Sequence, residues 1–189
     1  MKDTQSKQAF SEALERVMEK KPITKIRVTD LVEESGLSRQ TFYRHFRDIY
    51  DLIDWAHQEK THLAFELIDV DGDMAHVWAV CLRLMARSKN FYQQVITMAG
   101  YNSFYNGYYL RCQDNLLRMV GGQEHCDSTM LFTIRFIAAG ITQMTTEWIA
   151  GGMVQPPEEL AALFVESMPV KYLQAYKSQK SRGLAKAGS

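Results

Sequence analysis

Apolar residues recur at three- and four-residue spacing through most of the chain, and no segment keeps the alternation of a β-strand for long. The first helix is predicted over residues 4–20, where the apolar side chains share one face. It stops before Pro22, because the proline ring and the missing N–H interrupt a helix. The pattern therefore predicts an all-α chain that begins with an amphipathic helix.

Two short helices follow, separated by a turn. Thr29 is a suitable N-cap for the first, which is predicted to run through Glu34. Ser38 caps the second, which ends near Phe46. Gly36 lies between them and is the residue best able to adopt a left-handed turn.

A longer helix begins near residue 49, and a polar break at residues 69–73 separates it from the rest of the chain. Further helices are predicted at 74–88, 90–99, 101–120, 127–150 and 157–177. Residues 178–189 are basic and rich in small side chains, and they are predicted to be disordered.

The composition restricts the class of protein. Hydrophobic residues make up 46% and aromatic residues 11% of the 189-residue chain, which suffices for a packed core and excludes a disordered chain. No apolar run is long enough to span a membrane, and the first residues lack the apolar stretch of a signal peptide. The three cysteines, Cys81, Cys112 and Cys126, are scattered without a CxxC pair, which favours a reducing interior. We therefore expect a cytoplasmic protein without disulfides, structural zinc or membrane contact.

The sequence contains no recognisable pattern for a cofactor, a metal ion or a catalytic nucleophile. The acidic run at residues 69–73 resembles the start of a calcium loop, but Val80 stands where such a loop needs a glutamate. His62 and Glu66 share a helix face without the HExxH spacing of a zinc site. We therefore expect no cofactor, no metal and no enzymatic activity.

Positive charge is concentrated in one stretch, although the chain as a whole is neutral. The 22 basic and 22 acidic residues balance, yet residues 35–47 contain arginines and a histidine and no acid. A local cationic surface indicates contact with a polyanion, and a solvated helix face is the alternative.

Residues 28–46, VTDLVEESGLSRQTFYRHF, have the order helix, glycine-containing turn, helix that defines a helix-turn-helix. In the second helix Phe42, Phe46 and the following Ile49 share an apolar face. The opposite face carries side chains that hydrogen-bond phosphates and base edges, namely Arg39, Gln40, Tyr43 and Arg44. This division indicates a recognition helix for the major groove of DNA.

The same stretch resembles the signature of the tetracycline-repressor-like (TetR/AcrR) regulators. The positions that carry the resemblance are Val28, Asp30, Leu31, Gly36, Leu37, Ser38, Thr41, Phe42, Tyr43, His45, Phe46 and Leu52. The resemblance implies a homodimeric, all-α transcription regulator. Its three-helix DNA-binding domain would span residues 1–48 and its helical ligand-sensing and dimerisation domain residues 49–177. Within the family, the chain is most similar to the subgroup that includes activators of dihydroxyacetone-kinase operons.

The resemblance places Arg39, Gln40 and Thr41 at positions that face bases, and Tyr43 and His45 at positions that contact phosphate or base edges. The candidate DNA contacts are these five residues and four others nearby. They are Thr29, Ser38, Arg39, Gln40, Thr41, Tyr43, Arg44, His45 and Arg47. Two features depart from the family pattern: Ile49 stands where a lysine commonly contacts phosphate, and Val32 and Ser35 replace small alanines. Arg44 and Arg47 are the nearby cations that can replace the lysine.

Aromatic side chains are concentrated between residues 90 and 110, with asparagines among them. A plain hydrophobic core and a small-molecule pocket both fit this pattern, and the family resemblance favours the pocket. The candidate lining residues are Trp78, Cys81, Met85, Phe91, Met98, Tyr101, Tyr105 and Tyr108.

The predicted helix at 127–150 is apolar around its whole circumference between Met130 and Ile141, so it must be covered on every side. A partner subunit across a twofold axis is one such cover, with the helix at 157–177 completing a four-helix interface. A central core helix in a monomer is the alternative. The candidate interface residues are Phe132, Ile134, Ile137, Ile141, Met144, Trp148, Leu163 and Phe164.

The function expected from these features is sequence-specific binding of double-stranded DNA by a homodimer on a pseudo-palindromic operator. An unknown small molecule bound in the C-terminal domain would change the affinity. The alternative is a regulator whose C-terminal domain senses a partner protein.

Overall fold

The computed structural model describes residues 2–66, 73–98 and 104–187, and within these ranges its regular structure consists of helices alone. The elements are α1 (Lys2–Lys20), η1 (Ile23–Lys25), α2 (Val28–Ser35), α3 (Arg39–His45), α4 (Ile49–Glu66), α5 (Met74–Arg87), α6 (Lys89–Val95), α7 (Phe104–Met119), η3 (Gln123–His125), α8 (Ser128–Ala150), α9 (Pro157–Glu166) and α10 (Val170–Ala187). The fold is all-α, which confirms the prediction from the sequence.

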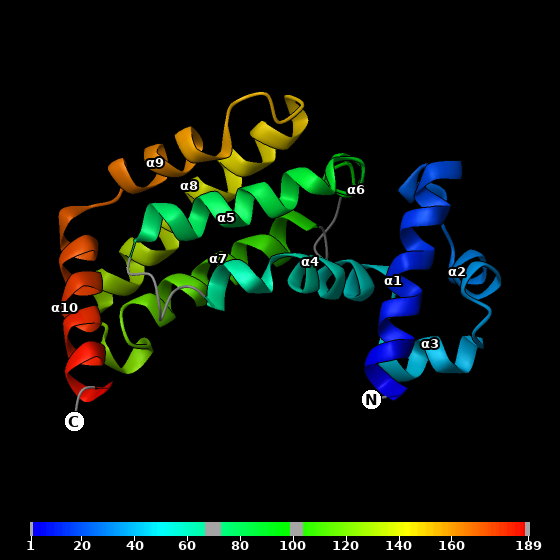
Figure 1. The fold of residues 1–189 in the computed structure, drawn as a ribbon, viewed down its shortest axis with the longest axis horizontal. Helices are drawn as coiled ribbons and strands as arrows, with labels where there is room; N and C mark the ends of the chain where they lie inside the picture. Colours follow the sequence, from blue (N-terminus) through cyan, green and yellow to red (C-terminus); the bar gives the residue numbers. More distant parts are fainter. Residues whose placement is uncertain (1, 67–72, 99–103, 188–189) are drawn as a thin grey trace.

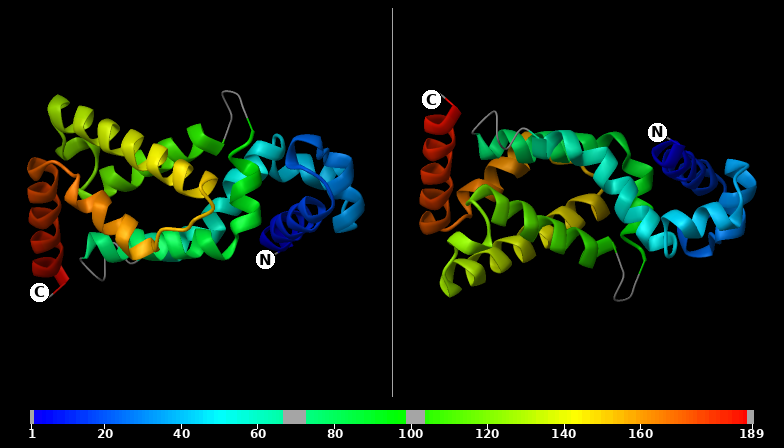
Figure 2. Two further views of the ribbon diagram at one scale, coloured as in Figure 1. Left: turned by 90° about the horizontal axis from the view of Figure 1, so that it is seen from above. Right: turned by 90° about the horizontal axis from the view of Figure 1, so that it is seen from below.

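The helices form an elongated molecule (Figure 1). A three-helix unit of α1, α2 and α3, here called the head, lies at one end, and α4 leads from it into the remaining helices, here called the body. In the body, α5 packs on α9 and α7 packs on α8, while α4 contacts both α5 and α7. The two views of Figure 2 show α10 crossing the end of the body that is farthest from the head.

Aromatic rings hold the head together. Phe10 of α1 is fully buried and meets the rings of Phe42 and Phe46 edge-on, with centroids 5.2 and 6.4 Å away. Leu14 and Leu31, also fully buried, pack into the same core from α1 and α2. Because edge-on aromatic pairs add roughly 0.5–1.5 kcal/mol beyond the burial of their surface, these contacts fix how α3 lies on α1.

The turn between α2 and α3 has the structure that the sequence predicts. Gly36 adopts the left-handed conformation, with φ of 70°, and its N–H donates to the Val32 carbonyl at 3.0 Å. Ser38 caps α3, since its Oγ accepts a hydrogen bond from the Thr41 N–H at 3.0 Å. Both ends of the turn are therefore stabilised by local bonds.

The start of α2 differs from the prediction. Thr29 lies within the first turn and is exposed, so it is not the cap. Asp30 instead accepts the Arg27 N–H at 2.6 Å. A carboxylate at the third helical position can reach back to the preceding N–H, which makes a capping hydroxyl unnecessary here.

The C-terminal region contains two helices where the sequence predicts one over 157–177. Pro169 lies between α9 and α10, and its missing N–H ends the helical hydrogen bonds. α10 then continues through Ala187, although residues 178–189 are predicted to be disordered. Tyr172 and Tyr176 are buried and attach α10 to the body, which allows the helix-forming residues after them to extend it.

The described ranges contain neither a membrane-spanning helix nor a cluster of metal-binding side chains. None of their helices combines the length and the apolar character that a bilayer span requires. Nor do any three of their His, Cys, Asp and Glu side chains lie close enough to hold a metal ion. Residues 69–72, which include most of the acidic run, lie outside the described residues.

One side chain of the body binds the backbone of the head. The Gln94 amide on α6 accepts the Ile23 N–H at 3.0 Å and donates to the Met18 carbonyl at 2.9 Å. The Met18 carbonyl has no helical partner, because the residue four positions later is Pro22, which lacks an N–H. Gln94 therefore replaces the hydrogen bonds that α1 loses at its end.

Replacing Gln94 by alanine removes both bonds and leaves two partly buried backbone groups unpaired. We expect Gln94→Ala to lower the free energy of unfolding by about 1–3 kcal/mol, measured by chemical denaturation. Gln93→Ala is the matched control, because the neighbouring amide forms no hydrogen bond to the head within the described residues. Equal losses in the two variants would contradict this role of Gln94.

A histidine is buried in the aromatic core of the body. His57 on α4 is 1% exposed, and its Nδ1 lies 3.0 Å from the Tyr92 hydroxyl. The rings of Phe104 and Tyr108 meet the imidazole edge-on at 5.4 and 5.3 Å. Burial lowers the pKa of His57 to about 4, so the imidazole is neutral at neutral pH.

This low pKa makes stability depend on pH. The unfolded histidine titrates near pH 6.5, so the unfolded chain takes up the proton first as the pH falls. The contribution of neutral His57 to the free energy of unfolding is therefore complete above about pH 6.5 and decreases as the pH falls toward 4. At pH 5 we expect the free energy of unfolding to be lower by about 2 kcal/mol than at neutral pH. Urea unfolding at about pH 7.5 and pH 5 should show a smaller difference for His57→Gln than for the wild type. An unchanged pH dependence in the variant would contradict the assignment to His57.

Candidate nucleic-acid interface

Helix α3 packs one face against the core of the head and leaves the opposite face exposed. Phe42 and Phe46 are 0% and 2% exposed and point into the core of the head. The exposed side chains are Arg39, Gln40, Tyr43, Arg44 and Arg47. Since α3 lies at the head end of the molecule (Figure 1), this face is open to a large partner.

The exposed face begins at the capped end of α3. Arg39 and Gln40 form its first turn, and the Arg39 guanidinium lies 5.6 Å from the centre of the Tyr43 ring. Ser38 and Thr41 are already paired with each other, with their hydroxyl oxygens 2.8 Å apart. The cap therefore uses these two hydroxyls, while the arginine, glutamine and tyrosine remain available to a partner.

His45 lies beside this face and is largely buried. Its Nε2 accepts a hydrogen bond from the Arg44 guanidinium at 3.2 Å. Burial and then the Arg44 charge lower the pKa of His45, and the carboxylate of Asp3 opposes them from 3.9 Å. The imidazole is therefore a neutral hydrogen-bonding group at neutral pH rather than a cation.

Several other basic residues of the head are already paired. Lys20 and Arg16 bind the Glu34 carboxylate at 2.6 and 2.8 Å, and Lys21 binds Asp30 at 2.6 Å. These ion pairs connect α1 and the residues after it to α2. The exposed cations of the helix-turn-helix are Arg39, Arg44 and Arg47. Two of them have longer ion pairs, Arg44 with Asp3 at 3.8 Å and Arg47 with Asp51 at 3.6 Å.

The departure at position 49 has a structural consequence. Ile49 is half-buried against the hydrophobic core, so no cation is available there. Arg47, two positions earlier, is 89% exposed at its side chain. Its N–H donates to Asp51 Oδ2 at 3.0 Å, and its Nε lies 3.6 Å from the same oxygen. Arg47 is thus held at the junction of α3 and α4 with its guanidinium open to solvent.

The residues predicted to line a pocket lie mostly inside the packed core. Trp78, Cys81, Met85, Phe91 and Tyr108 are each 3% exposed or less. Met98 is half-buried and Tyr105 is 37% exposed, whereas Tyr101 lies outside the described residues. The Trp78 ring meets Phe65 and Phe164 edge-on, and burial raises the pKa of the Cys81 thiol. These side chains therefore fill space in the body.

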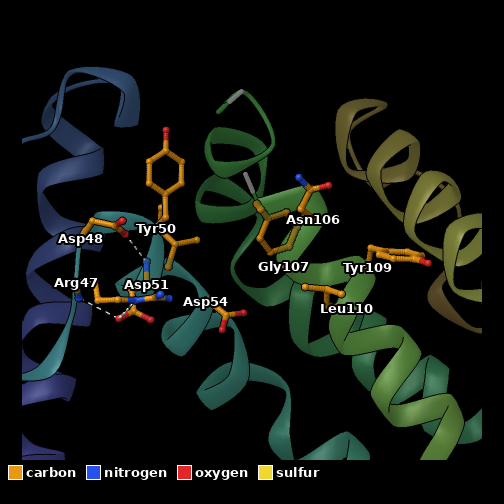
Figure 3. A pocket seen from close by; sticks show the side chains of 11 residues that line it. Arg47, Asp48, Tyr50, Asp51, Asp54, Asn106, Gly107, Tyr109 and Leu110 are labelled. Atoms are coloured by element: carbon orange, nitrogen blue, oxygen red, sulfur yellow. Dashed lines mark hydrogen bonds and ion pairs between the residues drawn. The ribbon is translucent and has the colours of Figure 1, made fainter. Parts of the chain in front are cut away.

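An open cleft lies elsewhere, between α4 and α7 at the junction of head and body (Figure 3). Its volume is about 410 Å³, and none of the residues predicted for the pocket lines it. Aspartates from α4 and the residue before it line one side, and Tyr109 and Leu110 of α7 line the other (Figure 3). The sequence contained a signal for this site, because Asp48, Asp51 and Asp54 recur every three residues and so share a helix face.

The residues predicted for a dimer interface separate into two groups. Ile134, Ile137, Ile141, Trp148 and Phe164 are buried in the chain's own core, at 7% exposure or less, and so are not available to a second copy. The exposed members are Phe132, Met144 and Leu163, and Phe136, which was not predicted, is 69% exposed on the same helix as Phe132. The sequence could not separate these groups, since both consist of apolar residues on one helix pair.

Two family models match the chain. One, described as bacterial regulatory proteins of the tetR family, covers residues 11–54, and the other, described as a transcriptional regulator C-terminal region, covers residues 76–169. The HTH-type dhaKLM operon transcriptional activator DhaS of Lactococcus lactis subsp. lactis (strain IL1403) is 25% identical over 154 residues. This alignment covers 76% of the chain and 79% of that protein.

Solved structures show the same fold. The dihydroxyacetone kinase operon activator DhaS superposes with a TM-score of 0.60 at 21% identity, covering 91% of this chain and 96% of that one. The TetR family repressor AlkX from Dietzia sp. strain DQ12-45-1b superposes with a TM-score of 0.51 at 17% identity, covering 89% and 95%.

Proposed function

Because the chain belongs to the TetR family of bacterial transcriptional regulators, we propose that it binds a pseudo-palindromic DNA operator as a homodimer and responds to a small molecule. Its relatives are transcription factors and not enzymes. The observation that carries the DNA-binding proposal is the exposed face of α3, which presents arginine, glutamine and tyrosine side chains. The opposite face of α3 is fixed by the aromatic contact of Phe42 with Phe10.

The side chains of this face have different roles in the proposal. Arg39 and Gln40 lie in the first turn of α3, and the first turns of a recognition helix contact base edges in the major groove. Arginine and glutamine read guanine and adenine there through paired hydrogen bonds. Arg44 and Arg47 lie farther along, where a cation contacts phosphate without reading sequence.

Two substitutions separate these roles. Arg39→Ala should weaken binding to a selected duplex by about 1–3 kcal/mol and relax the preference at one base pair. Arg47→Ala should weaken the binding of all duplexes to a similar extent. It should also make the slope of log affinity against log salt concentration shallower by about one, because one phosphate contact is lost. The measurement is fluorescence anisotropy on a duplex selected from a random library, at several salt concentrations.

Arg118→Ala is the control for both substitutions, because it removes an exposed arginine of α7 outside the head. The control should leave the affinity unchanged. If Arg39→Ala behaved like Arg118→Ala, the proposed DNA-binding face would be wrong.

Exposed apolar side chains on α8 support the proposed homodimer. Phe132 and Phe136 are 67% and 69% exposed and Met144 is 43% exposed, and on α9 Leu163 is 48% exposed. Gly140 lies between Phe136 and Met144 on α8. A Cβ built there would meet no atom within 4 Å, so the space beside this glycine is open. On α8 the exposed apolar side chains are spaced by multiples of four residues and so lie along one side of the helix, which favours coverage by another protein surface. Two copies of α8 and α9 related by a twofold axis would provide it.

The dimer is tested by a charge on this surface. Phe136→Arg should convert the dimer to a monomer in sedimentation velocity at micromolar concentration, because an unpaired charge would be buried in an apolar contact. The same variant should lose operator affinity, since one recognition helix contacts too few base pairs. Leu63→Arg, at an exposed apolar residue of α4, is the matched control and should remain dimeric. A monomeric wild type would contradict the proposal.

One observation favours a second candidate, a protein signal in place of a small molecule. The interior residues around Trp78 are closely packed, so a signal could instead act on the surface of the body. The two candidates differ in a thermal-shift measurement, because a small molecule stabilises the protein alone while a protein signal requires a second chain.

A further inference from the structure

The cleft at the junction of head and body contains two kinds of surface. Ile53 and Phe104, which are 2% and 6% exposed, belong to both the core and the cleft lining and provide an apolar base. Leu110 of α7 adds apolar surface on one side, as Figure 3 shows, and Tyr109 belongs to the same lining. A volume of about 410 Å³ is within the range of pockets that hold small organic molecules.

The other side of the cleft is anionic. It carries three aspartates and one arginine, so the lining has a net negative charge. The Arg111 guanidinium neutralises Asp54, whose two oxygens it binds at 2.9 and 2.7 Å. The negative charge that remains on the lining is therefore that of Asp48 and, in part, that of Asp51, since Arg47 Nε lies 3.6 Å from Asp51 Oδ2.

These two aspartates each have a carboxylate oxygen available. Asp48 uses Oδ1 to accept the Asp51 N–H at 2.9 Å, and Asp51 uses Oδ2 to bind Arg47. Asp48 Oδ2 and Asp51 Oδ1 have no hydrogen-bond partner among the described residues. A donor that enters the cleft can therefore bind them without breaking an existing bond.

The ligand that fits this lining is an amphipathic cation. Carboxylates select a positive charge, and the apolar side chains of Ile53, Phe104 and Leu110 favour an apolar body. A bare metal ion fits less well, because within the described ranges no three acidic, histidine or cysteine side chains converge on one point. We propose that this cleft is an effector site for organic ammonium compounds with an apolar, ring-sized body.

The position of the cleft connects such a ligand to DNA binding. Asp51 binds Arg47, which lies at the end of the head, whereas Tyr109 and Leu110 belong to the body. A ligand that contacts both sides would favour one orientation of the head relative to the body. This inference rests on the proposed function, because the coupling has a meaning only if α3 binds DNA.

Isothermal titration with 4-phenylbutylammonium tests the site directly and requires no DNA. The ammonium should bind at least about tenfold more tightly than 4-phenylbutyrate, and the uncharged 4-phenylbutan-1-ol should lie between them. The double variant Asp48→Asn/Asp51→Asn should weaken binding of the ammonium by about tenfold. Asparagine keeps the side-chain oxygens that accept the two backbone N–H groups, so the fold should be retained.

The matched control is Glu59→Gln/Glu66→Gln, which removes two charges from exposed positions of the same helix outside the cleft. It should leave the affinity for the ammonium within about twofold, as expected for solvent-screened charges. Equal binding of the ammonium and the carboxylate, or equal losses in the two double variants, would overturn the site.

The coupling is read separately by anisotropy on the selected duplex. Saturating ammonium should change the operator Kd by about fivefold or more in the wild type and not in Asp48→Asn/Asp51→Asn. An unchanged operator Kd with saturated cleft would overturn the effector role. Absence of duplex binding without any ligand would instead contradict the proposed function, while the titration without DNA would still test the site.

Discussion

The edge-on contacts of Phe10 with Phe42 and Phe46 are the interaction on which the arrangement of the head depends. Helix α3 has only 7 residues, and a helix of this length is not stable alone in water. Its conformation and direction are therefore set by the apolar side chains that it buries against α1. Since those side chains occupy one face, the arginines, the glutamine and the tyrosine are left on the other face. The polar surface that the DNA-binding proposal requires is thus a consequence of core packing.

Helix α4 connects the head to the body through a series of side-chain contacts. At its start Asp51 binds Arg47, one turn later Asp54 binds Arg111 of α7, and farther along His57 is buried among aromatic rings of the body. Gln94 adds a second connection from α6 to the end of α1. Under the proposed function, a change in the position of α7 or α6 relative to α4 would act on the head through these bonds, and the cleft lies beside them.

The sequence predicted the head more accurately than the body because the signals of the head are local. The cap at Ser38 and the left-handed turn at Gly36 depend on residues within a few positions of each other. Their prediction was confirmed, whereas the cap at Thr29 was wrong because Asp30 competes for the same role. The break at Pro169 was also a local signal, and the prediction of one helix over 157–177 missed it.

The sequence by itself determined that the chain is all-α, where most helices begin and end, and that one short helix separates an apolar from a cationic face. It did not determine which of the apolar residues on α8 are covered, since Phe132 and Ile134 are both hydrophobic and only contacts with other helices leave the first exposed and bury the second. The same holds for the cleft. The three-residue spacing of the aspartates was visible in the sequence, but the opposite side, with Tyr109 and Leu110, comes from α7, more than fifty positions away. Hydrophobicity and helix periodicity are properties of a segment, whereas burial and cavities arise between segments, so the tertiary structure alone decided them.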